Sequence, residues 1–407
     1  MAEKKDLGVS EYEQRLRNKM ERLELVKASF STSYDLLSPG RKKQWRRLSV
    51  FPEDFDRNAA IAVLKMAPEP SAETLSDLVR WSLVDYVQLP DSENGRYKLH
   101  DLARLFAESY LEPDEAIDAQ QKHAKHYLKV LSGAGKLYQK GGNSILAGLE
   151  LFDREWANIK VGHAWTKNRI QSHRKMTKSD SKIVVEMADS YANDGIYILE
   201  LRLHPRDLID WLETGVIAAR IMGHRGAEGA RLGSLGSAYS ALGETRRAIE
   251  YHEQALKIAR EIGDRRGDGN RLGNLGNRYS DLGETRKAIE YHEQALAISR
   301  EIGDRRGDGN RLGNLGSAYS DLGAGESNKS IDYCDRALEI FKKMEYRLGE
   351  GDALFCKSLA LYELGQRQEA LDGAKAALQI FEQIESPHAE KVRQKLSEWQ
   401  GPDCQEN

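Results

Sequence analysis

The sequence predicts a mainly α-helical protein with a helical repeat array in its C-terminal half and a smaller helical domain near its N-terminus. Two observations predict this class. A 40-residue stretch recurs in tandem, and a fixed period of about 20–50 residues is typical of repeat architectures. Apolar residues also recur at helical spacing along most of the chain, and they alternate with polar residues only near residues 84–100.

The repeat is clearest between residues 231 and 310. Residues 231–270 read RLGSLGSAYSALGETRRAIEYHEQALKIAREIGDRRGDGN, and residues 271–310 match them at 33 of 40 positions without a gap. A third unit begins at residue 311 with RLGNLGSAYSDLG and then gains two residues within 324–330. A fourth, degenerate unit is visible over residues 353–378.

Each unit is predicted to form two helices. The first carries an apolar stripe at helical spacing, made of Leu272, Leu275, Tyr279 and Leu282. Gly283 suits the left-handed conformation that ends a helix, and Asp264 after Gly263 offers an N-cap for the next first helix. Gly276 is expected where the two helices cross, because a side chain there would push the two backbones apart.

These positions resemble the tetratricopeptide repeat. Leu275-Gly276, Tyr279, Ala288 and Ala295 match its Leu-Gly, Tyr, Ala and Ala signature. The 40-residue period and the GDRRGDGN joint are similar to the long-repeat group that includes kinesin light chains and spindle-orientation adaptors. A coiled coil does not fit, because the period is not a heptad. The resemblance implies an α-α superhelix whose first helices line the concave side.

By this resemblance, the peptide-binding groove is lined by equivalent polar positions of two repeats: Asn270, Arg271, Asn274 and Asn277, then Asn310, Arg311, Asn314 and Ser317. An asparagine amide both donates and accepts hydrogen bonds, so it can hold an extended peptide backbone of any sequence. Bare Gly273 and Gly313 would let a ligand approach closely. The arginines are expected near the rim, where they would contact carboxylates. The alternative is that these residues only solvate the concave face.

Residues 26–112 follow a different pattern. Helices are predicted over 26–37, 41–48, 58–66 and 72–83. Alternation then predicts two strands, 84–89 and 96–100, joined by a turn at 91–95. A last helix is predicted over 101–110. Helices followed by a two-stranded wing are typical of a winged helix.

Between these regions, residues 114–170 are also predicted to be helical, and the polar, basic stretch 167–182 is expected to be an exposed connection. Residues 183–222 indicate an earlier, diverged hairpin with one helix over 183–200 and a second over 205–222. The predicted domains are a charged helix at 1–25, a winged helix at 26–112, a helical connector at 113–182, the repeat superhelix at 183–384, and a capping helix with a tail at 385–407.

The N-terminal region resembles the winged-helix part of NB-ARC, or STAND-type, ATPases. The matching segments are Ser33-Tyr34-Asp35-Leu36-Leu37, Leu48-Ser49-Val50-Phe51-Pro52 with Phe55-Asp56, Leu78-Val79 with Ser82-Leu83-Val84, and Arg96-Tyr97-Lys98-Leu99-His100-Asp101-Leu102. In that family a P-loop ATPase precedes the winged helix, and a repeat sensor follows it. Leu99-His100-Asp101 is similar to the MHD-type motif, whose histidine reaches the β-phosphate of bound ADP. The resemblance makes His100 a nucleotide sensor and Asp101 its structural partner.

The chain departs from that family because it has no G-x-x-x-x-G-K-[ST] motif. In the nearest look-alike, Gly133-Ala134-Gly135-Lys136, Val130 replaces the first glycine and Leu137 replaces the residue that must hold the metal. His100 alone cannot hold a nucleotide, since phosphate needs several backbone donors and a cation. The alternative interpretation is that His100 starts a helix and packs against the wing. An ATPase domain acting in trans is a candidate partner.

Composition and motifs disfavour several other functions. The net charge of -3 and the isoelectric point near 6.4 give no overall attraction to nucleic acid. The best basic patch is 41–47, and DNA binding by the winged helix, as in a transcriptional regulator, is the alternative function. His252-Glu253 begins an HExxH pattern, but Leu256 replaces the second histidine, so no metal site is predicted.

The three cysteines are widely spaced and lack a CxxC pair, which favours neither zinc nor a disulfide framework and fits a cytoplasmic location. The charged N-terminus is unlike a signal peptide, and no run of about 18 apolar residues predicts a membrane span. The sequence therefore predicts a non-enzymatic adaptor or sensor of a STAND-type signalling system, which binds a protein or an extended peptide and needs no cofactor.

Overall fold

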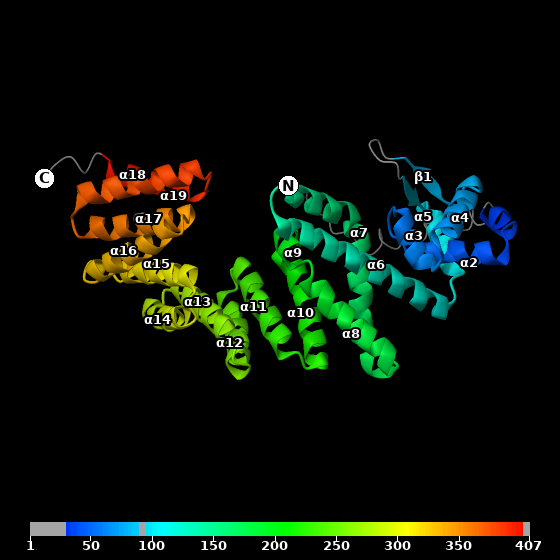
Figure 1. Cartoon of the computed structure of the whole chain (residues 1–407), viewed down its shortest axis with the longest axis horizontal. Helices are drawn as coiled ribbons and strands as arrows, with labels where there is room; N and C mark the ends of the chain where they lie inside the picture. Colours follow the sequence, from blue (N-terminus) through cyan, green and yellow to red (C-terminus); the bar gives the residue numbers. More distant parts are fainter. Residues whose placement is uncertain (1–29, 89–94, 402–407) are drawn as a thin grey trace, which may run out of the picture. The chain divides into compact units, whose positions relative to one another are not determined.

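The computed structural model describes residues 30–88 and 95–401, and the chain divides into two compact units, Met1–Arg202 and Leu203–Asn407. The first is called the N-terminal unit and the second the C-terminal unit. The described residues are mainly helical and include a two-stranded sheet, labelled with the helices in Figure 1. This confirms the predicted fold class of helices with a small β-element followed by a helical repeat array.

The N-terminal unit begins with helices and a small sheet. Residues 30–35 are helical, and the elements that follow are α2 (Pro39–Leu48), α3 (Arg57–Leu64), α4 (Pro68–Arg80), β1 (Asp85–Val87), β2 (Arg96–Lys98) and α5 (Asp101–Ser109). The Asp56 carboxylate caps α3 by accepting the backbone N–H of Ala59 at 2.7 Å. β1 and β2 pair antiparallel, as predicted. The predicted charged helix 1–25, residues 26–29 and most of the predicted turn 91–95 lie outside the described residues.

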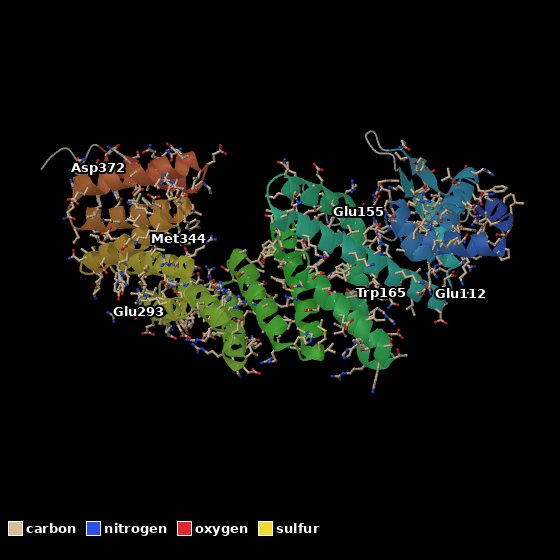
Figure 2. The ribbon with its side chains drawn as sticks, in the orientation of Figure 1. Glu112, Glu155, Trp165, Glu293, Met344 and Asp372 are labelled. Carbon is tan, nitrogen blue, oxygen red and sulfur yellow. The ribbon has the colours of Figure 1, made fainter. Side chains whose placement is uncertain are left out.

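The core of this region forms around Trp45, which is fully buried and donates its indole N–H to the Leu83 carbonyl at 3.1 Å. Strand β2 is tied to the long helices that follow, α6 (Pro113–Lys140) and α7 (Ser144–Ile170). The Arg96 guanidinium binds both carboxylate oxygens of Glu155 on α7, at 2.6 and 3.0 Å. Glu155 is labelled in Figure 2. Both side chains are buried, so Glu155 is the buried counter-charge of Arg96, which also binds the half-exposed Asp54 at 2.7 Å.

Of two predictions for the end of this unit, one holds in part and one is wrong. Most described residues of 167–182 are exposed, as expected, but both ends of this segment are helical, because α7 continues to the buried Ile170 and α8 (Lys178–Asn193) follows its N-cap Thr177. The expected single helix over 183–200 is broken at Asp194-Gly195, between α8 and α9 (Ile196–Arg202). A Cβ atom on Gly195 would lie 2.3 Å from Leu131 of α6, so the packing of α6 determines where the chain bends.

The C-terminal unit starts with α10 (Pro205–Met222), whose bounds agree with the prediction to the residue. Four helical hairpins follow: α11 (Arg225–Ala241) with α12 (Thr245–Glu261), α13 (Arg265–Asp281) with α14 (Thr285–Glu301), α15 (Arg305–Asp321) with α16 (Ser327–Lys343), and α17 (Arg347–Glu363) with α18 (Arg367–Gln383). Gly283 has a φ of 73°, and Asp264 accepts the backbone N–H of Gly267 at 2.9 Å. The predicted helix-ending role of Gly283 and the predicted N-cap role of Asp264 are both confirmed.

Inside each hairpin, matching side chains of the two helices pack together. Tyrosines stack with ring centroids 5.1–5.3 Å apart, in the pairs Tyr239–Tyr251, Tyr279–Tyr291 and Tyr319–Tyr333. The prediction for Gly276 needs a correction, because its nearest neighbour is a side chain and not the backbone of the second helix. A Cβ atom on Gly276 would lie 2.5 Å from Cε1 of the buried His292 ring.

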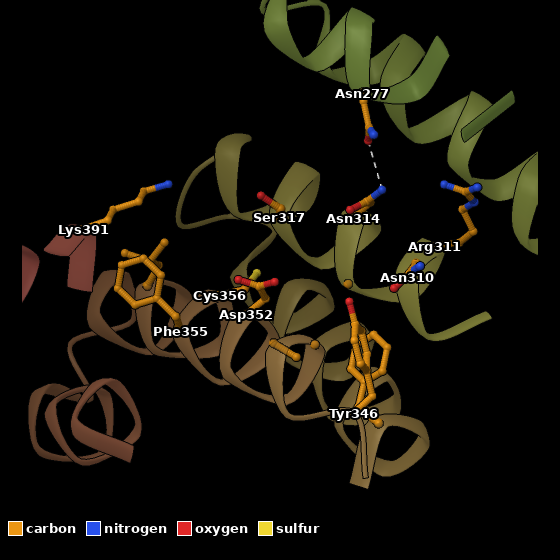
Figure 3. Close-up of a pocket in the computed structure, with 15 residues that line it drawn as sticks. Asn277, Asn310, Arg311, Asn314, Ser317, Tyr346, Asp352, Phe355, Cys356 and Lys391 are labelled. Atoms are coloured by element: carbon orange, nitrogen blue, oxygen red, sulfur yellow. Dashed lines mark hydrogen bonds between the residues drawn. The ribbon is translucent and has the colours of Figure 1, made fainter. Parts of the chain in front are cut away.

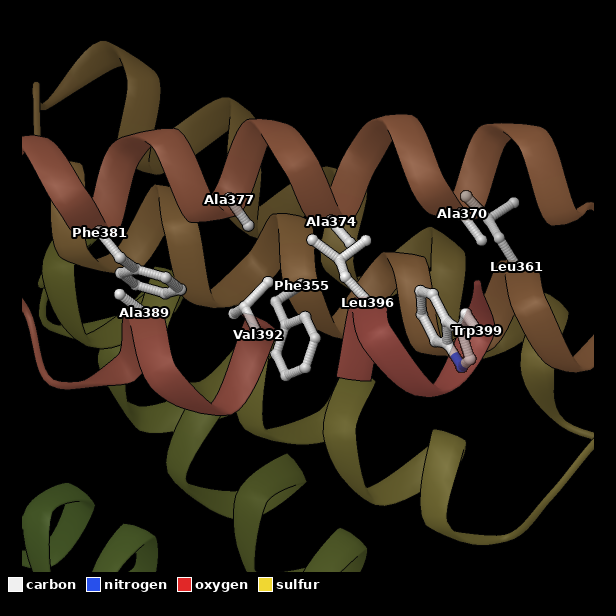
Figure 4. Close-up of a cluster of buried hydrophobic side chains, with 10 residues drawn as sticks. All are labelled: Phe355, Leu361, Ala370, Ala374, Ala377, Phe381, Ala389, Val392, Leu396 and Trp399. Carbon is white, nitrogen blue, oxygen red and sulfur yellow. The ribbon is translucent and has the colours of Figure 1, made fainter. Parts of the chain in front are cut away.

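The array ends with α19 (His388–Trp399), which covers the last hairpin. Ala389, Val392, Leu396 and Trp399 pack with Phe381 and other buried residues of α17 and α18, as Figure 4 shows. Terminal repeats need such a cap, since their outer apolar face has no next repeat to cover it. The division between the two units falls inside the segment 183–222, so the start of the array at 183 and the other domain boundaries stay predictions.

Candidate functional site

A cavity of about 430 Å³ opens in the C-terminal unit on the face lined by α13, α15, α17 and α19 (Figure 3). Its lining includes these predicted groove residues: Asn277, Asn310, Arg311, Asn314 and Ser317. Asn270, Arg271 and Asn274 belong to α13, at positions one repeat before Asn310, Arg311 and Asn314, and they do not line it. The first helices of successive repeats thus bring most of the predicted residues to one hollow.

The amide groups of this cavity are only partly used by the protein itself. Asn314 Nδ2 donates to Asn277 Oδ1 at 3.0 Å, which links α15 to α13. Within the described ranges, neither Asn310 nor Asn274 makes a side-chain hydrogen bond, and both side chains are at least partly exposed. Because an amide has two donors and one acceptor oxygen, each of these residues keeps hydrogen-bonding capacity for a ligand.

The groove arginines differ from the expectation that they lie near the rim. The Arg311 guanidinium lies against α13, where a Cβ atom on Gly273 would be 2.0 Å from its Cζ. Arg271 lies in the same way against Gly233 of α11. Neither guanidinium forms an ion pair with another described residue, and burial lowers the pKa of both. These arginines fill the seam between repeats, and Gly273 is therefore covered while Gly313 stays open.

The far wall of the cavity comes from the degenerate fourth repeat, which the sequence reasoning did not assign to the site. Asp352 and Phe355 of α17, Tyr346 before it and Lys391 of α19 line this wall. The Asp352 carboxylate lies 2.8 Å from Nδ1 of His388. Burial raises the pKa of Asp352, while the hydrogen bond from His388 opposes that rise. Counting to the sixth residue of each first helix, with the two-residue insertion included, would have found Asp352 as the equivalent of Asn310.

Two buried cysteines lie beneath the cavity and are neighbours in space, although they are far apart in sequence. Cys356 lines the cavity, and Cys334 of α16 is a buried free thiol close to it. The contact with Cys356, together with burial, raises the pKa of the Cys334 thiol. A protonated buried thiol is a weak nucleophile, so the pair behaves as part of the core.

His100 and Asp101 lie in the N-terminal unit at the start of α5. His100 is the N-cap of this helix, and its Nδ1 accepts the backbone N–H of Leu102 at 3.3 Å. Asp101 lies 3.8 Å from Arg104. The structure thus gives His100 a helix-capping role, and its role as a nucleotide sensor stays a prediction. Residues 133–136 lie inside α6, so they form no phosphate-binding loop.

The basic patch at 41–47 is largely neutralised by neighbouring carboxylates. The ion pairs are Arg41–Asp77, Lys42–Asp35, Arg46–Glu115 and Arg47–Asp118, with N–O distances of 2.5–3.7 Å. Trp45 of the same segment is fully buried. A DNA-binding surface needs cations that are free to contact phosphates, so this arrangement does not favour the alternative function.

Other site chemistries find no support in the part of the chain that the structure describes. No cluster of three or more His, Cys, Asp or Glu side chains suited to a metal ion occurs there. None of its helices has the length and apolar character required for crossing a membrane.

The fold and the hollow lined by successive first helices define a helical-repeat protein. Residues 227–301, which span the first two hairpins, match the tetratricopeptide repeat family model. Two curated relatives are described as regulatory protein AfsR. The one from Streptomyces griseus is 32% identical over 122 residues, and the one from Streptomyces coelicolor is 29% identical over 134 residues. These matches cover 28% and 31% of this chain but only 12% and 13% of the relatives.

Several solved structures are similar to this chain. Aspartyl phosphate phosphatase F from Bacillus subtilis is 13% identical, with a TM-score of 0.50 over 90% of this chain and 82% of that one. A STAND protein with a tetratricopeptide repeat sensor from Pyrococcus horikoshii is 17% identical, with a TM-score of 0.37 over 91% and 61%. NprR in complex with its cognate peptide NprX is 17% identical, with a TM-score of 0.40 over 68% and 81%. At these identities the likeness concerns the fold alone.

Proposed function

We propose that this protein is an interaction sensor that holds an extended peptide, or an extended segment of a protein, along the first helices of its repeats. The observation that carries this proposal is the cavity lined by amide side chains from successive repeats, with hydrogen-bonding capacity left unused. A peptide backbone offers N–H and C=O groups in alternation, and asparagine amides complement both.

The proposed ligand also fits the spacing of the groove. Asn274 and Asn310 lie on consecutive first helices, and Asn314 follows Asn310 by one helical turn on the same face. A ligand in extended conformation can contact several repeats at once, whereas a small compact ligand can contact only one. Non-catalytic recognition agrees with the tetratricopeptide repeats, and the shared segment with regulatory proteins agrees with a role in regulation. Membership of a STAND-type signalling system, with an ATPase acting in trans, extends this proposal.

The test is a selection of random peptides displayed on phage, followed by titration of the selected peptides against purified variants. The double variant Asn274→Ala with Asn310→Ala is expected to weaken binding about tenfold or more, because each lost hydrogen bond contributes about 1 kcal/mol. Neither residue makes a side-chain hydrogen bond within the described ranges, and alanine favours the helix more than asparagine does, so the melting temperature should not fall. Asn314→Ala is a poorer choice, since it also removes the bond to Asn277.

The matched control is Asn328→Ala, at an exposed position on the second helix α16. It should bind the selected peptides as the unmodified protein does. Equal affinities for the unmodified protein and the Asn274/Asn310 double variant would refute the groove assignment.

A further inference from the structure

Consecutive first helices contact each other along what is called here a seam. The seams α11–α13 and α13–α15 are built alike, and the seam α15–α17 differs. In the first two seams an arginine of one first helix covers a glycine of the preceding first helix. Arg271 covers Gly233, and Arg311 covers Gly273, with the same 2.0 Å separation between the arginine Cζ and a Cβ built on the glycine. The repeated geometry shows that a guanidinium packs well on the bare backbone of this helix.

This arrangement is absent at Gly313. Arg311 is the seventh residue of α15, and the seventh residue of α17 is Ala353. The Ala353 side chain is 2% exposed and ends at its methyl group, so it cannot reach across the seam. No atom lies within 4 Å of a Cβ built on Gly313. The cavity includes both residues in its lining, and it exists because the guanidinium expected over Gly313 is missing.

The residues that line the uncovered space over Gly313 suit a cation. Asp352 stands where Asn310 stands in α15 and Asn270 in α13, so the fourth repeat replaces an amide by a carboxylate next to the missing arginine. Its side chain is 50% exposed, which leaves the carboxylate accessible from the cavity. The amide oxygen of Asn310 supplies a further acceptor beside it, whereas the ring of Tyr346 is already covered by Arg306, whose Cζ lies 4.7 Å from the ring centroid.

Two cations also line the cavity, and they do not prevent this occupancy. Arg311 and Lys391 lie toward opposite ends of the cavity, with Asp352 between them, as Figure 3 shows. Arg311 packs between α13 and α15, away from Gly313, and the nearby Asp304 carboxylate partly compensates its charge, as Asp264 does for Arg271. Lys391 is exposed, so its charge is screened by solvent.

We propose that the cavity over Gly313 is a specificity pocket for an arginine side chain of the bound peptide. The guanidinium lies over Gly313 as Arg311 lies over Gly273, and Asp352 provides the counter-charge. The proposal rests on the proposed function, in which the amides hold the peptide backbone. A planar guanidinium fits better than an ammonium, because it packs flat on the glycine while its fork of donors reaches both Asp352 and Asn310. An apolar side chain would cover the Asp352 carboxylate and leave it only the hydrogen bond with His388.

The direct probe is N-acetyl-arginine N-methylamide, titrated into the full-length protein and followed by NMR chemical shifts. We expect saturable binding at one site. The citrulline analogue, which has the same shape without the charge, and the glutamate analogue should each bind at least about tenfold more weakly. Equal affinity for arginine and citrulline, or a preference for glutamate, would overturn the proposal, the latter by placing an anion against Arg311 and Lys391.

Two variants of the pocket give independent readouts. Asp352→Asn should weaken binding of the arginine probe at least about tenfold. Ala353→Arg should complete the seam from within the chain and abolish binding of the probe. If Ala353→Arg fails to fold, Asp352→Asn decides alone. Undiminished binding to a folded Asp352→Asn variant contradicts the proposal.

A gain-of-site experiment uses the first seam as a matched control. Arg271→Ala opens a vacancy over Gly233 in which Asn270 occupies the place of Asp352, so it should add no arginine site. Arg271→Ala combined with Asn270→Asp supplies both the vacancy and the carboxylate, and it should raise the stoichiometry from one probe molecule to two. A folded double variant that still binds only one molecule would show that these two features do not create the site.

The peptides selected on phage separate failure of the pocket from failure of the groove. Selected peptides should carry an arginine, and Asp352→Asn should remove this preference while backbone-dependent binding persists. Peptides that bind and lose affinity in the Asn274/Asn310 double variant, but show no arginine preference, refute the pocket and leave the proposed function intact. If no peptide binds, the groove assignment fails, and the arginine probe still tests the pocket.

Discussion

Replacing Gly276 with alanine probes how each hairpin is packed. The new Cβ atom would lie 2.5 Å from Cε1 and 2.7 Å from Nδ1 of His292. The His292 ring is only 1% exposed, so it cannot turn away into solvent. Overpacking of this kind costs about 1–3 kcal/mol, whereas alanine gains up to about 1 kcal/mol over glycine inside a helix. The overlap is severe, so we expect a net loss of about 1–2 kcal/mol in the free energy of unfolding.

The other hairpins of the same chain show how this clash is avoided. At the equivalent positions, the first helix carries glycine opposite histidine or cysteine, and it carries the larger serine only opposite alanine. The pairs are Gly236 with His252, Gly276 with His292, Gly316 with Cys334, and Ser358 with Ala374. The double variant Gly276→Ser with His292→Ala copies the last pair. It should be less destabilised than the sum of the two single variants, by about 1–3 kcal/mol of coupling energy.

Urea unfolding followed by circular dichroism measures these effects. The control is Gly313→Ala, which lies in the first helix α15 and meets no atom within 4 Å. It should raise the free energy of unfolding by up to about 1 kcal/mol, since only helix propensity changes. The packing argument is refuted if Gly276→Ala stabilises the protein as Gly313→Ala does, or if the double variant shows no coupling.

Two further predictions concern buried ionisable groups. Burial lowers the pKa of His252 to about 4 and that of His292 to about 3, so their neutral forms stabilise the fold fully above the unfolded-state pKa of 6.5. This stabilisation is lost as the pH falls from 6.5 toward these values. The loss is about 1.4 kcal/mol per pH unit for each histidine. Urea midpoints measured between pH 8 and 4 should show this loss only below 6.5. Glu155→Ala removes the buried carboxylate partner of Arg96 and leaves it only the half-exposed Asp54, 2.7 Å away, so it should cost up to about 3–5 kcal/mol. Removing the exposed carboxylate of Glu301 should barely move the midpoint.

The helical repeats could be predicted because their signals are local and periodic. Asp264 caps a helix three residues away, and Gly283 adopts a positive φ that glycine favours, so each signal acts within one turn of its own position. The bounds of α10 follow from Pro205 at its start and Gly223 after its end. The strands β1 and β2 were likewise predictable from the alternation of apolar and polar residues, although all three residues of β1 are exposed.

The rest depended on contacts between residues far apart in the chain. The break between α8 and α9 is set by Leu131 of α6, which leaves no room for a side chain at Gly195. The basic patch looked available in the sequence, but its cations are paired with carboxylates of other elements, such as Asp77 and Asp118. The periodic pattern of the sequence does not show which elements contact each other, so these contacts could not be predicted from it.

For the candidate site, the sequence by itself determined which residues stand at equivalent positions of successive repeats, because the period fixes the face of each first helix. Only the tertiary structure decided how that face is used. It placed Arg311 over Gly273 and left Gly313 uncovered, since Ala353 is too short to cross the seam. The cavity thus arises from the absence of a side chain, and a missing side chain becomes visible only when the neighbouring repeats are packed together.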